Sequence, residues 1–286
     1  MRLNGIQAVF SFNKRAGMGS KFIFFFLSVL LAFSISTQAQ SLVKKHVKKG
    51  RRNKSEHQLT LARKVMEADW EFGNEMINDS LKTYVYPNFV LRYGVSKLIE
   101  LNLEVNPITT VPKLSTGTKK ISGMEPLMIG ARIAVKDETK WWPEIALSLQ
   151  VAPPFAATKN YAATYWAPLI QCSMQKRIKS HFSLSGSGGI LYDGFSTNPT
   201  WLYSITPAYN INEKYSVATD VFGFSAQHVL PMNNVDLDLS CQLNKRLNLG
   251  ATAGTGISSM AHKGYIGING SYVLIQQHSK EKNNQD

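Results

Sequence analysis

Five side chains of this 286-residue chain are of the types that perform nucleophilic hydrolysis: Asp193, Ser196, His228, Ser258 and His262. A serine, a histidine and an aspartate that converge can act as nucleophile, general base and orienting carboxylate. Neither serine lies in a recognisable nucleophile motif. A barrel enzyme that modifies lipids therefore stays an alternative, and it requires His228 or His262 within hydrogen-bond reach of a serine and a carboxylate.

Other chemistries have no motif in the sequence. Zinc-ligand spacing and a phosphate-binding glycine loop are absent. Gly186, Gly188 and Gly189 lie in a strand-like Ser/Gly run and precede no helical pattern, whereas a dinucleotide-binding loop opens a helix. Glycines there make room for close packing or a bend. We expect no metal, no cofactor and no enzymatic activity.

A larger set of polar residues lies opposite the apolar positions of alternating segments, and we expect these side chains to face inward. They are Glu71, Asn88, Arg92, Glu100, Asn102, Glu104, Arg132, Glu144, Gln150, Gln171, Gln175, Asp220, Asp236 and Asp238. Arg92 and Arg132 should pair with carboxylates, because an unpaired charge away from bulk water is costly. Two roles stay open: the charges hold a narrow lumen together, or they line a solute path and set its selectivity.

Alternation is the main structural signal of the chain. Every second residue from 235 to 243 is apolar and the residues between are polar, which predicts a strand with one apolar face. About twelve such segments follow one another. They lie near 67–75, 82–95, 99–105, 127–134, 144–151, 165–177, 182–187, 199–211, 214–224, 235–244, 247–254 and 264–275. Their lengths average about ten residues, which fits the roughly 9–11 residues with which a tilted strand crosses a bilayer.

The connections between these segments alternate in length. Short polar turns are expected at 96–97, 136–140, 177–180, 212–214 and 244–246, and longer loops at 106–124, 153–164, 192–199, 225–233 and 257–263. Short turns at one end and long loops at the other are typical of an outer-membrane barrel. An even strand number then leaves both chain ends in the periplasm.

A soluble β-sandwich or lipocalin-like barrel also alternates, but its outer face should be rich in Lys and Glu. Here the polar face consists mainly of Ser, Gly, Asn, Gln and isolated charges, which are small enough to share a lumen. Aromatic residues near segment ends suggest interfacial girdles: Tyr84, Tyr86, Trp141, Trp142, Tyr165, Trp166, Trp201, Tyr203, Tyr209, Tyr215, Tyr265 and Tyr272. Only closure satisfies every backbone amide in hydrocarbon, so we predict an all-β, closed antiparallel transmembrane barrel.

The N-terminus predicts export. Basic residues precede an apolar run from Phe22 to Ile35, and small and polar residues follow it. The run is too short for a bilayer-spanning anchor of roughly 20 residues, so it predicts a signal peptide over 1–39, cleaved near Ala39. Translation from Met18 would give a signal of more ordinary length. The remaining parts are a basic periplasmic segment over 40–66, the barrel over 67–275 and a polar tail over 276–286.

Charge is concentrated near the N-terminus. Residues 1–39 carry four basic and no acidic side chains, so their removal lowers the formal net charge from +13 to +9. The basic run 44–54 contributes much of that excess: Lys44, Lys45, Lys48, Lys49, Arg51, Arg52 and Lys54. Exported chains rarely meet nucleic acid and no aromatic residues interleave for stacking, so we expect no nucleic-acid partner. Cys172 and Cys241 lie on apolar faces of strands that are not neighbours, and we expect two free thiols.

One stretch resembles a known family. Residues 87–101 read Pro-Asn-Phe-Val-Leu-Arg-Tyr-Gly-Val-Ser-Lys-Leu-Ile-Glu-Leu, and they resemble the signature P-x-x-x-L-R-Y-G-(I/L/V)-(S/T)-x-x-x-E-L. This is the signature of the outer-membrane family named for the meta-pathway of phenol degradation. Residues 129–132 and 143–147 are similar to that family's next hairpin. The resemblance implies a transporter-like barrel of about twelve strands, associated by name with uptake of aromatic compounds, with Arg92 and Glu100 inward on adjacent strands. It fixes no catalytic residue.

The leading hypothesis is a porin-like barrel of the bacterial outer membrane that passes small, hydrophobic or aromatic solutes. Its partners would be outer-membrane lipid, the solute and, during insertion, the barrel-assembly machinery. The alternative is a structural or interaction barrel whose lumen is plugged by side chains or by residues 41–60. The channel hypothesis requires an open lumen and the structural hypothesis a plugged one, so the residues that line the lumen discriminate between the two hypotheses.

Overall fold

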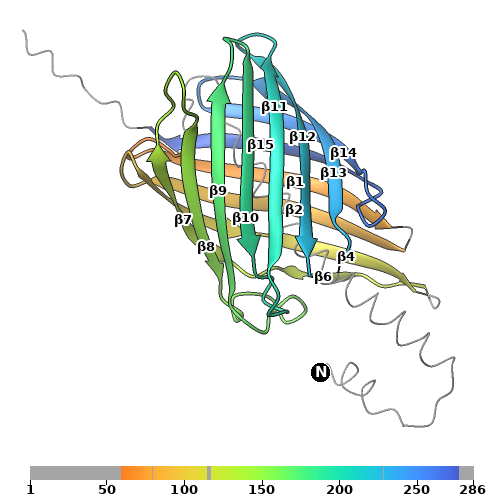
Figure 1. Ribbon diagram of the computed structural model, residues 1–286. Helices are drawn as coiled ribbons and strands as arrows, with labels where there is room; N and C mark the ends of the chain where they lie inside the picture. Colours follow the sequence, from red (N-terminus) through yellow and green to blue (C-terminus); the bar gives the residue numbers. More distant parts are fainter. Residues whose placement is uncertain (1–58, 79, 115–116, 228, 277–286) are drawn as a thin grey trace, which may run out of the picture. The chain divides into compact units, whose positions relative to one another are not determined.

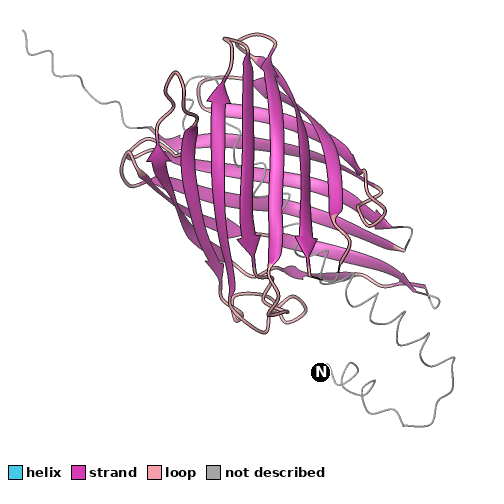
Figure 2. Ribbon diagram, in the orientation of Figure 1, coloured by secondary structure: helices cyan, strands magenta, loops and turns pink. Residues whose placement is uncertain are grey.

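The computed structural model describes residues 59–78, 80–114, 117–227 and 229–276. Within these ranges the regular structure consists of β-strands (Figure 2). The described part contains no helix with the length and apolar character needed to cross a bilayer. The predicted signal peptide, the basic run 44–54 and all but the first residue of the polar tail lie outside the described residues.

Twelve strands form a closed barrel (Figure 1). In chain order they are β1 (Met66–Asn78), β2 (Leu81–Gly94), β3 (Ile99–Val105), β7 (Met128–Lys136), β8 (Glu144–Ala152), β9 (Ala167–Arg177), β10 (Phe182–Leu191), β11 (Thr200–Asn210), β12 (Tyr215–Ala226), β13 (Met232–Gln242), β14 (Leu247–Gly256) and β15 (Gly264–Ile275). Each pairs antiparallel with its neighbour in this order. These strands coincide closely with the twelve predicted segments.

Closure occurs between the first and last strands. β1 pairs with β2 on one side and with β15 on the other, and Met66 lies opposite Ile275. Both ends of the barrel domain therefore lie at one end of the barrel, together with the turns after β2, β7, β9, β11 and β13. We call this the turn end and the opposite one the loop end. The predicted arrangement of short turns and long loops is confirmed in outline.

The long loop expected over 106–124 is instead largely built of short strands. This stretch contains β4 (Pro107–Leu114), β5 (Gly117–Thr118) and β6 (Ile121–Met124). β4 pairs with the first part of β2 and with β6, so the wall is extended at the loop end. The sequence signal is weak because Thr, Pro and Lys interrupt the alternation, while the long partner strand β2 supplies the backbone hydrogen bonds.

The outer face of the barrel is apolar. Large side chains about half exposed recur on successive strands: Leu101, Ile129, Ile170, Ile205, Leu237, Leu239, Ile266 and Ile268. A continuous exposed apolar surface marks contact with lipid or another apolar partner. The polar positions between them are buried. This is the reverse of a soluble sandwich, whose apolar side chains are hidden and whose polar side chains meet water.

Candidate functional site: the polar interior and its apolar collar

The structure buries nearly all of the side chains that the alternation assigns to the inner face. In a closed sheet one layer thick, a side chain can be buried only on the inner side. Asn88, Arg92, Glu100, Asn102, Glu104, Arg132, Glu144, Gln150, Gln171, Asp220, Asp236 and Asp238 are buried, and Glu71 and Gln175 are half-buried. Their predicted role in lining a solute path stays a prediction.

Arg92 is the centre of an ion-pair cluster at the turn end. Its Nε lies 2.7 Å from Glu100 Oε1 and one terminal nitrogen lies 2.8 Å from Glu100 Oε2, a bidentate pair between adjacent strands. The other terminal nitrogen lies 3.3 Å from Glu67 and 3.6 Å from Asp69. The short turn between β2 and β3 fixes this register, with Arg92 opposite Asn102 and Gly94 opposite Glu100. The predicted inward pairing of Arg92 is therefore confirmed.

A chain segment lies against this cluster. The leading segment, residues 59–65, precedes β1, and its Leu59, Thr60 and Leu61 are at most 3% exposed. The backbone N–H of Leu59 donates to Glu144 Oε1 at 2.5 Å, and that of Leu61 donates to Glu100 Oε2 at 2.7 Å. Arg132 donates to the carbonyl of Leu59 at 3.0 Å. Inward charges of three strands thus hold a short stretch of backbone inside the turn end.

Gly94 makes this contact possible. The N–H of Lys64 donates to the carbonyl oxygen of Gly94 at 2.6 Å, and the N–H of Gly94 donates to the carbonyl oxygen of Val65 at 2.9 Å. A Cβ atom on Gly94 would lie 2.0 Å from the carbonyl oxygen of Ala62. The close approach of two backbones therefore requires glycine here.

Three aspartates form a second polar group on β12 and β13. Asp220 lies opposite Asp236, and Asp238 follows two residues later on the same face. Thr206 donates to Asp220 and Thr252 donates to Asp238, both through their hydroxyls. These hydroxyls hydrogen-bond to carboxyl groups that the sheet register places close together.

The assignment of Tyr265 to an aromatic girdle is wrong. The other eleven aromatic residues of that prediction are exposed, whereas Tyr265 is 8% exposed and its hydroxyl donates to Asp236 Oδ2 at 2.9 Å. The ring crosses over Gly254, where a Cβ atom would lie 2.3 Å from Tyr265 Cζ. Its place at the start of a strand suggested an interfacial position, but the pleat turns it inward with Gly267 and Asn269.

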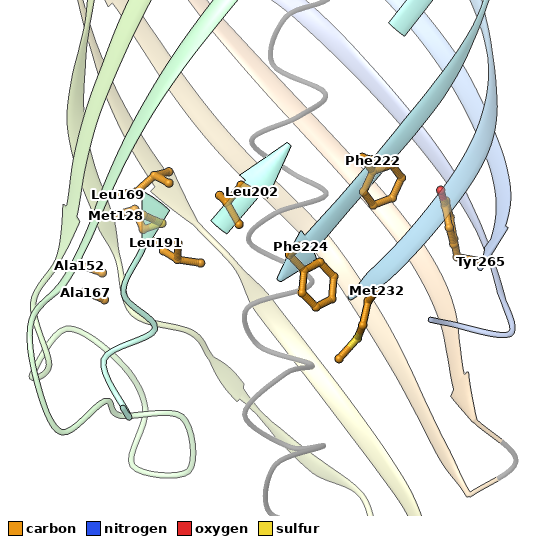
Figure 3. Packing of buried hydrophobic residues seen from close by; sticks show 10 residues of the cluster. All are labelled: Met128, Ala152, Ala167, Leu169, Leu191, Leu202, Phe222, Phe224, Met232 and Tyr265. Atoms are coloured by element: carbon orange, nitrogen blue, oxygen red, sulfur yellow. The ribbon is translucent and has the colours of Figure 1, made fainter. Parts of the chain in front are cut away.

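An apolar collar lies on the inner side near the loop end (Figure 3). Its members are Met128, Ala152, Ala167, Leu169, Leu191, Leu202, Phe222, Phe224, Met232 and Tyr265. Most lie at strand ends that lead into loops, and the register places them side by side, with Leu169 opposite Leu191 and Phe224 opposite both Leu202 and Met232. The rings of Phe222 and Tyr265 are 6.4 Å apart in an edge-to-face arrangement. A solute that moved along the inner wall from the loop end would pass from this apolar surface to Asp220, Asp236 and Asp238.

A pocket opens against β15, β1 and β2. Its polar lining includes Glu71, Glu75, Asn88, Asn106 and Tyr265. The side-chain oxygens of Asn88 and Asn106 are buried and have no hydrogen-bond partner among the described residues. An unsatisfied buried acceptor is costly, so both oxygens favour a donor on whatever occupies the pocket.

The described residues among those considered for hydrolysis do not assemble a triad. His262 Nδ1 lies 2.5 Å from Glu75 Oε1, but its Nε2 has no hydrogen-bond partner in the described part of the chain. Ser258 donates to Pro231 and accepts from the N–H of Asn233. Asp193 accepts the N–H groups of Phe195 and Ser196, which is the geometry of a turn. His228 lies outside the described residues.

Two further observations concern sulfur and metal ligands. Cys172 and Cys241 are both free, as predicted. No group of three His, Cys, Asp or Glu side chains within the described ranges has the arrangement of a metal site.

Sequence reasoning missed three features of this interior: the apolar collar, the leading segment and the contact between His262 and Glu75. The collar had a detectable signal, because Phe222 and Phe224 continue the inward positions after Asp220 in steps of two. The other two had none. Each joins residues far apart in the sequence that meet only when the barrel has closed.

Comparisons with solved structures show the same fold. An outer-membrane channel from Pseudomonas putida F1 superposes with a TM-score of 0.61 at 10% identity, over 78% of this chain and 100% of that one. The translocator domain of the autotransporter NalP from Neisseria meningitidis gives 0.54 at 8%, over 84% and 97%. The KdgM porin in complex with disordered oligogalacturonate gives 0.51 at 7%, over 74% and 99%. At such identities the likeness establishes the fold of an outer-membrane barrel.

A comparison with curated protein sequences found no match. A family model, described as "Putative MetA-pathway of phenol degradation", matches residues 66–274, from the first strand of the barrel almost to the end of the last. This is the family that the stretch at 87–101 resembles. The chain belongs to this family.

Proposed function

We propose that this protein is an outer-membrane channel for small solutes that combine an apolar part with a polar group. The observation that carries the proposal is the apolar collar inside a barrel whose other inward side chains are mainly polar. A lumen that only needed to be filled could be apolar throughout, whereas two zones of opposite character suit a ligand with two ends. Ligand sites typically combine an apolar lining with a few placed polar groups.

The membrane and the route of export belong to the same proposal. The exposed apolar belt supports contact with outer-membrane lipid, and the signal peptide predicted from the sequence supports export. Insertion would then depend on the barrel-assembly machinery. The solved barrels that resemble the chain include a channel and a porin, which agrees with transport rather than catalysis.

The collar can be tested with ionic current. A small aromatic solute that rests in the collar should interrupt the current through a single barrel, so phenol is added to refolded protein in a planar bilayer. We expect phenol-dependent blocking events in the natural protein and their loss in Phe222→Ser with Phe224→Ser. Phe155→Ser is the matched control, because Phe155 is a loop aromatic that is 78% exposed.

Two results would contradict the proposal. Equal blocking in the collar variant and the control would show that the collar does not bind the solute. Absence of current in every variant and at every salt concentration would favour the second candidate, a structural barrel with a plugged lumen. That candidate draws support from the leading segment, which lies inside the turn end.

A further inference from the structure

A small pocket lies in the inner wall where β1, β2 and β15 meet. Gly73 lies between Glu71 and Glu75 in the inward row of β1, and it is opposite Gly267 of β15. Two facing glycines leave the space of two side chains empty. The pocket that results has a volume of about 30 Å³, which is room for about two groups of the size of water.

A bulge in β2 shapes the other side of the pocket. β2 covers three residue steps between Val85 and Asn88, whereas β1 covers two between Gly73 and Glu71. The extra residue lies in the stretch that contains Pro87, which has no N–H to give to the ladder. Such bulges change the direction of nearby side chains and are common next to functional sites.

Two amide side chains present acceptors to this pocket. Phe89 lies opposite Val105, so the next residues along the two chains, Asn88 and Asn106, are neighbours across the wall. Both line the pocket, both are at most 4% exposed, and neither amide oxygen has a hydrogen-bond partner among the described residues. Asn106 donates through Nδ2 to Glu125, which leaves its carbonyl oxygen as the free acceptor.

The missing partner must donate hydrogen bonds. Two carbonyl oxygens cannot satisfy each other, and an unsatisfied buried acceptor is costly. A hydroxyl group has one donor, whereas a primary ammonium has three donors and no acceptor. One ammonium can therefore bond both oxygens at once, and its head is small enough for the pocket, whereas an aromatic ring is not. Water, with two donors, is the occupant that an ammonium would displace.

The pocket is continuous with the apolar collar. Tyr265 lines the pocket and is also a member of the collar, where its ring lies 6.4 Å from the ring of Phe222. The Tyr265 hydroxyl donates to Asp236 and so does not bond the amide oxygens. A ligand with its head in the pocket would therefore place its apolar body against the ring of Tyr265.

We propose that this pocket binds the ammonium head of a small primary amine whose apolar body rests on the collar. This inference rests on the proposed channel function, since it names the polar group of the solute. An alkyl amine has a pKa of about 10 and is protonated at neutral pH. Recognition comes from two neutral amide oxygens and from the size of the pocket, and it does not depend on net charge.

The first experiment measures binding and needs no current. Benzylamine is titrated into the refolded full chain in a non-ionic detergent, with empty micelles as the blank, and calorimetry reports the affinity. Benzyltrimethylammonium has the same ring and charge, but its head is larger and has no N–H. We expect benzylamine to bind at least about tenfold more tightly, because its head donates hydrogen bonds that the quaternary ion lacks.

Two variants act on the pocket itself. Gly73→Ala places a Cβ atom in the hollow, and its nearest neighbour, the carbonyl oxygen of Ile266, lies at an ordinary 3.7 Å, so we expect the barrel to fold. Asn88→Leu keeps the shape of the side chain and removes one acceptor. Each should weaken benzylamine binding about tenfold. Gly188→Ala is the matched control, because Gly188 is exposed on β10 and a Cβ atom there has its nearest neighbour at 3.9 Å.

The outcomes separate this pocket from the channel. Equal binding of the two ions, or equal binding of benzylamine in Gly73→Ala, Asn88→Leu and the control, would overturn the amine pocket and leave the channel intact. Displacement of benzylamine by Na⁺ at equal concentration would also overturn it and identify a metal cation as the occupant. Selective, variant-sensitive binding in a barrel that passes no current would overturn the channel and leave the pocket established.

Discussion

The ion-pair cluster around Arg92 predicts an asymmetry that two single substitutions can reveal. Arg92 contacts three carboxylates, with Glu100 at 2.7 Å and the others at 3.3 and 3.6 Å, whereas Glu100 holds Arg92 and the backbone of Leu61. In Glu100→Gln the guanidinium keeps two acidic neighbours. In Arg92→Met three carboxylates remain without their shared cation. Arg92→Met should therefore destabilise the barrel more.

The expected losses in the free energy of unfolding follow from the burial of these side chains. Removal of one partner from a buried pair costs about 3–5 kcal/mol, because the other charge stays buried. We place Glu100→Gln at the lower end, about 3 kcal/mol, and Arg92→Met at the upper end, about 5 kcal/mol. The double variant should cost less than the sum, with a coupling of about 1–3 kcal/mol, as for contacting residues in one network.

Urea unfolding in lipid vesicles, followed by tryptophan fluorescence, measures these free energies. Glu138→Gln is the control, because Glu138 pairs with Lys176 at 3.5 Å on the partly exposed turn end and should cost at most about 1 kcal/mol. Costs for Arg92→Met and Glu100→Gln no larger than that of the control would refute the reasoning. Such a result would mean that the cluster is solvated like a surface pair.

Three further predictions concern backbone contacts and thiols. Gly94→Ala places a Cβ atom 2.0 Å from the carbonyl oxygen of Ala62, so trypsin should cleave the leading segment faster in this variant while the barrel stays folded; an unchanged cleavage rate would contradict the contact. Gly254→Ala forces the ring of Tyr265 to move and should lower the free energy of unfolding more than Tyr265→Phe, which removes a hydrogen bond of about 1–3 kcal/mol. Mass spectrometry after alkylation without reductant should find both cysteines labelled on unfolding, and a shift in thermal stability with reductant would argue against free thiols.

The twelve barrel strands could be predicted from the sequence because alternation reports directly on the environment of each face. The half-exposed Leu237 and Leu239 alternate with the buried Asp236 and Asp238, whereas a soluble β-sandwich would hide the apolar set and expose the charges. The pairing of Arg92 with Glu100 could also be predicted from the sequence. Their strands are joined by a short turn, and a short turn fixes the register between neighbours.

Other features were decided only by the tertiary structure. Tyr265 has the composition and position of a girdle residue, and only the pleat of β15 and the space above Gly254 direct it to Asp236. β4 and β6 depend on the extra length of β2 as a template.

The sequence by itself therefore determined the strands, the lipid-facing surface and the polar character of the interior, because each depends on local periodicity alone. Closure decided the rest. Pairing of β1 with β15 brings the leading segment against Glu100 and Glu144, and it places the buried apolar residues of separate strands into one collar. No local pattern encodes these contacts, since they join strands that are distant in the chain and meet only around a closed wall.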